Sequence, residues 1–163
     1  MLALYGRPST WEWLLFFHIL FAVILVAATA AVTIAGLAAL RAASNEHSTF
    51  FRQTAFRINL FGVLPGFIAT ILIAGALADK EFPGDDAPGW LEAGWTITFI
   101  GGIIGGILLS GLQYWALRRA RAGAPRSWQA KIATYLAPVI LAALFVVLFL
   151  MTGKPGQDIP QPV

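Results

Sequence analysis

Hydrophobic residues fill four long stretches of the chain, and polar residues gather in the short segments between them. The four stretches run from Trp13 to Leu40, from Ile58 to Ala78, from Gly94 to Leu117 and from Ile132 to Thr152. Each is long enough to cross a hydrocarbon core of about 30 Å, which needs roughly 20 residues of helix. Their apolar character is continuous and does not alternate, and an open sheet edge in lipid would leave backbone groups unpaired. The pattern therefore predicts helices.

These stretches predict an all-α fold, a polytopic membrane protein built as a bundle of four transmembrane helices. Residues 1–153 form this single domain, and the Pro-rich tail 154–163 is expected to be extended. The first stretch is too long for its span and is followed by no small-residue cleavage pattern. We therefore expect a retained, tilted helix and not a removed signal peptide.

Composition agrees with a membrane protein. Hydrophobic residues make up 58% of the 163 residues and charged residues only 12%, whereas an ordinary soluble domain carries roughly 25% charged residues. The chain has no cysteine, which excludes disulfides, thiolate metal sites, iron–sulfur clusters and cysteine nucleophiles. No spacing in the sequence is typical of a catalytic dyad or of a metal site, so we expect a non-catalytic protein.

Charge separates the connections into two faces. The first and third connections hold most of the 11 basic residues: Arg41, Arg52, Arg57, Arg118, Arg119, Arg121, Arg126 and Lys131. The acidic residues lie on the other side, except for Glu46. The positive-inside rule then predicts cytoplasmic basic loops and both termini outside, in a bacterial cytoplasmic (inner) membrane. We attribute the net charge of +3 to this orientation signal and to anionic lipid, not to nucleic acid.

Two sets of residues predict how the helices meet the bilayer and each other. The tryptophans mark the two interfaces, with Trp11, Trp13, Trp90 and Trp95 on the outer face and Trp115 and Trp128 on the inner one. Glycines four residues apart predict faces where another backbone approaches closely: Gly101, Gly102, Gly105 and Gly106 in the third stretch, and Gly62 and Gly66 in the second. The partner of the third stretch is either another helix of this chain or another subunit, including a second copy.

His18 is the readily titratable side chain inside the four stretches, whose middles lack Asp, Glu, Lys and Arg. This pattern argues against a proton-coupled transporter or an ion pump. His47 is the other histidine, separated from His18 by roughly 22 residues of helix or about 33 Å, so one haem cannot use both. A five-coordinate haem, a site completed by another chain, or a quinone bound to His18 stays open. The alternative is a neutral imidazole satisfied by a neighbouring helix or by a carboxylate such as Glu12 or Glu92.

The segments "WLLFFHILFAVILVA" and "LFVVLFLMTGKPG", with a basic first loop and a Trp-bearing outer loop, resemble a family of small four-helix bacterial membrane proteins of unknown function. That family is loosely similar to the membrane part of copper-resistance D-type proteins. The resemblance implies that His18 matches the family's first-helix histidine and Lys154-Pro155-Gly156 its closing motif. Family members often carry a glycine pair where this chain has Ala27 and Ala28, which argues against close helix approach there. Two methionines and no cysteine argue against copper.

Three functions follow from these patterns. The leading hypothesis is a non-catalytic accessory or packing subunit of a larger membrane complex, docked through the glycine face of the third stretch. The second is a haem- or quinone-associated redox module that uses His18. The third is a small-solute transporter, for which the stretches offer only hydroxyls and one amide.

Overall fold

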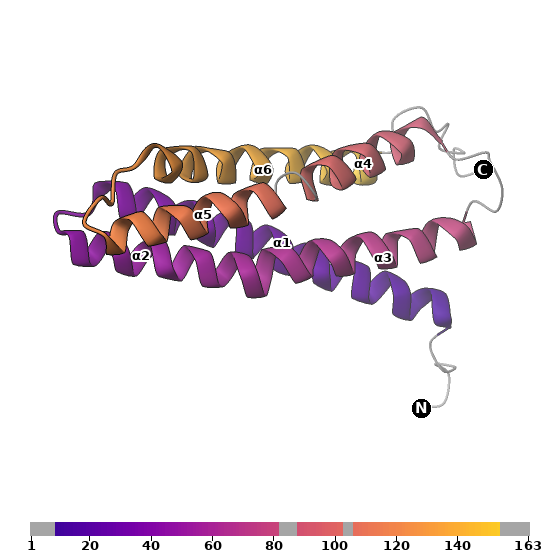
Figure 1. Cartoon of the computed structure of the whole chain (residues 1–163). Helices are drawn as coiled ribbons and strands as arrows, with labels where there is room; N and C mark the ends of the chain where they lie inside the picture. The colour runs from indigo at the N-terminus through magenta and orange to yellow at the C-terminus, as the bar shows by residue number, and fades with distance from the viewer. Residues whose placement is uncertain (1–8, 82–87, 103–105, 154–163) are drawn as a thin grey trace.

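The computed structural model describes residues 9–81, 88–102 and 106–153 (Figure 1). It contains α1 (Thr10–Arg41), α2 (Asn45–Ile58), the π-helix η1 (Asn59–Val63), α3 (Leu64–Glu81), α4 (Gly89–Ile100), α5 (Gly106–Arg121) and α6 (Trp128–Gly153). Within those ranges no strand occurs. The prediction of an all-α fold is confirmed for the described residues.

Three helices are long and apolar enough to cross a membrane: Thr10–Arg41, Asn45–Lys80 and Trp128–Gly153. The second of these joins α2, η1 and α3 into one continuous helix. The remaining predicted stretch, from Gly94 to Leu117, is divided between α4 and α5. Residues 103–105, Gly105 among them, lie outside the described residues, as do the tail 154–163 and its Lys154-Pro155-Gly156 motif. A fourth span therefore stays a prediction.

All the helices run along one long axis, and charge distinguishes its two ends (Figure 1). At one end lie the connections from α1 to α2 and from α5 to α6, with Arg41, Arg119, Arg121 and Arg126; we call it the basic end. At the other end α1 and α4 begin and α3 and α6 end, and we call it the acidic end. It carries Glu12, Asp79 and Glu92. The fold thus places the basic connections together at one end of the molecule and these acidic residues at the other.

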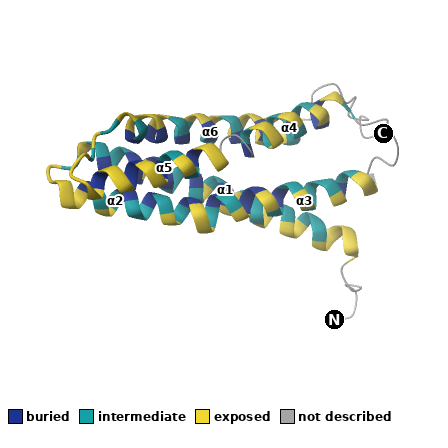
Figure 2. Ribbon diagram, in the orientation of Figure 1, coloured by how far each residue is buried: buried dark blue, intermediate teal, exposed yellow. Residues whose placement is uncertain are grey.

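Helix α1 is the centre of the packing and contacts α2, α3 and α6. The core between the helices consists of small and aliphatic side chains with one aromatic: Leu25, Val32, Val63, Phe67, Leu109, Ala133, Ala137, Ile140 and Leu144. Large apolar side chains also cover the outside of the helices, along which Figure 2 shows exposed residues at short intervals. Ile34, Phe61 and Phe149 are among the most exposed. An apolar exterior around an apolar core is expected when lipid is the solvent.

Glycines allow α3 to approach α1. A Cβ atom placed on Gly62 would lie 2.9 Å from the Cβ of Ala28, and one on Gly66 would lie 3.2 Å from the Cβ of Leu25. Close approach therefore does occur at Ala28, contrary to the expectation from the missing family glycines. The physical reason is that the glycine is on the partner helix, so only one of the two facing positions carries a side chain.

The glycines of the third stretch face different surroundings. A Cβ atom on Gly102 would lie 2.9 Å from Cδ1 of Phe67, and one on Gly106 would lie 3.1 Å from Cδ2 of Leu64. Both contacts are with α3 of the same chain. A Cβ atom on Gly101 would meet no described atom within 4 Å. The contacts of Gly102 and Gly106 are thus made inside the chain, and Gly101 is left on an open side.

The tryptophans do not all have the same environment. Trp11 and Trp13 at the acidic end and Trp115 and Trp128 towards the basic end are exposed, and the guanidinium of Arg118 lies 5.4 Å from the ring centre of Trp115. Trp90, in contrast, is buried, and Trp95 lines a cavity between helices. These last two side chains pack within the bundle, which interfacial anchoring alone does not require.

Candidate ligand cavity at His18

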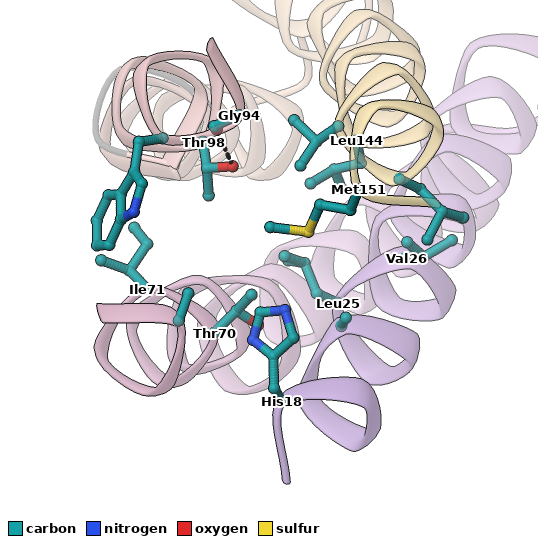
Figure 3. Close-up of a pocket in the computed structure, with 14 residues that line it drawn as sticks. His18, Leu25, Val26, Thr70, Ile71, Gly94, Thr98, Leu144 and Met151 are labelled. Atoms are coloured by element: carbon teal, nitrogen blue, oxygen red, sulfur yellow. Dashed lines mark hydrogen bonds between the residues drawn. The ribbon is translucent and has the colours of Figure 1, made fainter. Parts of the chain in front are cut away.

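A cavity lies near the acidic end, where the bundle separates into two helix pairs (Figure 3). Helix α1 packs along α3, and α4 packs along α6, whereas α3 and α4 make few contacts. The cavity occupies the space between the pairs, and all four helices line it. Its lining residues are His18, Ala22, Leu25, Val26, Thr70, Ile71, Ala74, Gly94, Trp95, Thr98, Leu144, Val147, Leu148 and Met151.

His18 enters the cavity from the third turn of α1, where its side chain is partly buried. Its imidazole approaches the backbone of Thr70 on α3, and Figure 3 shows the two residues side by side. The Nδ1 atom is buried and has no hydrogen-bond partner among the described residues. One ring nitrogen is therefore unpaired in the described structure.

Neither of the carboxylates considered as partners of His18 is hydrogen-bonded to it. Glu12 accepts a hydrogen bond from the backbone N–H of Ser9 and completes the capping box of α1. Glu92 is exposed on the first turn of α4. Of the partners considered from sequence, the structure brings a neighbouring helix to His18, and it brings only the backbone of that helix.

The other polar groups of the cavity differ in whether they are already satisfied. The Thr98 hydroxyl donates to the carbonyl of Gly94 at 2.7 Å. The Thr70 hydroxyl is buried without a hydrogen-bond partner in the described structure. The remaining lining is apolar, apart from the indole of Trp95. The cavity thus has one polar side, formed by His18 and Thr70, and an otherwise apolar wall.

The size of the cavity limits what it can hold. Its volume is about 70 Å³, and it is partly open to the outside of the protein. A single buried water needs roughly 10–15 Å³, and pockets for drug-sized ligands occupy roughly 300–1,000 Å³. The space therefore fits the polar end of a small ring or several waters, with the rest of a longer ligand lying outside it.

These residues do not fit a haem. A porphyrin is much larger than this space, and the second histidine is not within reach. His47 lies at the start of α2, at the basic end, and its Nδ1 is 2.9 Å from the Ser44 hydroxyl. No cluster of three or more His, Asp or Glu residues that could hold a metal ion occurs in residues 9–81, 88–102 and 106–153. Of the groups considered for His18, the geometry is compatible with a quinone-type head group.

Comparison with known proteins adds no relative. No protein-family model matches the chain, and neither curated proteins nor solved structures are significantly similar to it. The described chain defines a class only: an all-helical protein with three helices able to cross a membrane. The resemblance to the four-helix family stays a prediction.

The sequence singled out His18 but not the surroundings that make a cavity. Thr70 and Thr98 lie 52 and 80 positions after His18 in the chain. From the sequence they are only hydroxyl-bearing residues that could form hydrogen bonds between helices. Met151 reads as an ordinary apolar residue. No local signal distinguishes these residues from the rest of their helices, because the cavity arises from how the two helix pairs diverge.

Proposed function

We propose that the protein is an integral membrane protein that binds a lipid-soluble ligand at the His18 cavity. The proposed ligand class is an isoprenoid quinol or a similar lipid whose ring carries a hydroxyl group. The proposed setting is a four-span bundle in a bacterial cytoplasmic membrane, with the acidic end outside and the basic end in the cytoplasm. The segregation of charge between the two ends supports this orientation.

The observation that carries the proposal is the buried, unpartnered Nδ1 atom of His18 in a partly open, mostly apolar cavity. An unpaired buried polar atom costs about 1–3 kcal/mol. A ligand that supplies the missing hydrogen bond recovers this free energy on binding. The apolar walls suit a ring, and lipid around the bundle suits an isoprenoid chain.

The hydrogen-bonding capacity of the imidazole indicates which form of the ligand fits. The N–H of Thr70 lies inside α3 and is used by the helix, so the backbone group within reach of His18 is the carbonyl, which only accepts. Because Nδ1 has no hydrogen-bond partner in the described structure, we assign the contact with this carbonyl to the other ring nitrogen, Nε2, which must then carry the proton. Nδ1 is left as an acceptor in the neutral ring. We therefore favour a ligand hydroxyl over a ligand carbonyl, and the reduced quinol over the quinone.

Equilibrium dialysis of the purified protein in detergent micelles tests this proposal. We expect saturable binding of a short-chain benzoquinol under reducing conditions, and about tenfold weaker binding of the matching quinone, since one hydrogen bond differs. His18→Leu should weaken quinol binding about tenfold and abolish the preference. His47→Leu is the matched control at the basic end. Equal quinol affinity in His18→Leu and the native chain would refute the role of His18.

The role as an accessory subunit stays a prediction of the sequence. Two of the glycines on which it rests, Gly102 and Gly106, face α3 of the same chain. Docking through this stretch would therefore have to use the side on which Gly101 is open. For small-solute transport, the apolar lining of the cavity offers few groups to replace the hydration of a polar solute.

A further inference from the structure

A second unusual site lies at Arg52, on the side of α2 that faces α1, α5 and α6. Arg52 is only 5% exposed, and it lines a small cavity with Gly36 of α1, Gln113 of α5 and Thr134 of α6. From the sequence, Arg52 is one of the basic residues of the first connection. The structure instead places its guanidinium group inside the bundle.

The polar groups around this cavity are incompletely paired. The Nε and Nη2 atoms of Arg52 are buried and have no hydrogen-bond partner in the described structure, and the same is true of Oε1 of Gln113. The Thr134 hydroxyl donates to the carbonyl of Ala130 at 2.8 Å. The arginine and the glutamine thus line one cavity without bonding to each other.

The charge of Arg52 is also uncompensated. No carboxylate lines the cavity among the residues that the structure describes. Glu46 lies on the exposed first turn of the same helix, about 9 Å away along its axis, and Glu12, Asp79 and Glu92 belong to the acidic end. Arginine does not give up its proton in proteins. A buried charge without a counter-ion is strongly unfavourable, so a neutralising partner is expected here.

The space limits the partner to a very small one. The cavity measures about 10 Å³, which is about the volume needed by one water-sized particle. A water would satisfy hydrogen bonds but leave the charge, whereas a small anion does both. Turning the Gln113 amide over would direct its NH₂ group into the cavity as a further donor. We infer that Arg52 and Gln113 form a buried site for one small monovalent anion, of which chloride is the probe.

Thermal unfolding of the full chain in detergent micelles tests the site. The melting temperature is measured while chloride replaces gluconate, an anion too large for the cavity, at constant ionic strength. Above its dissociation constant, we expect chloride to raise the melting temperature by roughly 3–6 °C for each tenfold increase. Arg52→Gln should lose this response. Arg57→Gln, which changes an exposed arginine of the same helix, should keep it.

Gln113→Glu provides an independent test that does not depend on the folding of Arg52→Gln. The new carboxylate would lie beside Arg52 and take the place of the anion. We expect a higher melting temperature than the native chain in gluconate, and no response to chloride. A native chain whose melting temperature ignores chloride would overturn the inference. So would a Gln113→Glu variant with the full chloride response, because the ion would then bind elsewhere.

Discussion

At the scale of single residues, the unpaired polar atoms are the informative features of this chain. His18 could be singled out from the sequence because an imidazole is rare within an apolar stretch. The unpaired Nδ1 atom of His18 could not be predicted from the sequence, because its surroundings depend on how α3 approaches α1. Arg52 gave the opposite result: the sequence placed it among the basic residues of the first connection, whereas its burial arises from the packing of α1 and α5 against α2, with α6 across the small cavity.

Thr70 permits a prediction about an unpaired hydroxyl. Its hydroxyl is buried without a described partner, so Thr70→Val removes a desolvated group and no hydrogen bond. We expect the free energy of unfolding of the ligand-free protein to stay the same or to rise by up to about 1 kcal/mol.

Thr98→Val is the matched control on the facing wall, because that hydroxyl donates to Gly94 at 2.7 Å. It should lower the free energy of unfolding by about 0.5–1.5 kcal/mol. Chemical denaturation monitored by tryptophan fluorescence measures both variants. A Thr70→Val variant less stable than Thr98→Val would show that the Thr70 hydroxyl is satisfied.

At the scale of helices, the sequence predicted the positions of the apolar helices well. It did not predict that one apolar stretch is divided between two helices. Three of the four apolar stretches correspond to helices able to cross a membrane. The stretch from Gly94 to Leu117 instead contributes α4 and α5, which have different neighbours: α4 packs on α6, and α5 on α2 and α6. Hydropathy indicates only whether a segment lies in water or in an apolar environment. It does not indicate which helix packs beside that segment.

The contact between α1 and α3 gives a prediction at this scale. Gly62→Ala would place its Cβ atom 2.9 Å from that of Ala28, so the two helices must separate. We expect the melting temperature to fall, corresponding to about 1–3 kcal/mol of stability. Adding Ala28→Gly should restore most of this loss, since it removes the opposing methyl group.

Gly111→Ala is the control for the glycine change itself. A Cβ atom at Gly111 would meet nothing within 4 Å, so alanine should be neutral or stabilise α5 by about 0.5–1 kcal/mol. Thermal unfolding of the three variants and the native chain measures the difference. Equal effects of Gly62→Ala and Gly111→Ala would contradict close packing of α1 on α3.

At the scale of the whole molecule, charge gives the bundle two distinct ends. Because the chain has no cysteine, single cysteines report which side of the membrane each end occupies. We expect Gly89→Cys, at the acidic end, to react with a membrane-impermeant maleimide added to intact cells. Ala122→Cys, at the basic end, should react only after the membrane is opened. The reverse pattern would contradict the proposed orientation.

The central claim is that Nδ1 of His18 accepts a hydrogen bond from a ligand hydroxyl, and nitrogen NMR of histidine-labelled protein tests it most directly. The chain has only two histidines, and His47→Gln assigns their signals. Without ligand, we predict an unprotonated Nδ1 in His18. A short-chain benzoquinol should then shift the His18 Nδ1 resonance in the direction of hydrogen bonding and leave His47 unchanged. A His18 Nδ1 resonance that does not move at saturating quinol would contradict the account.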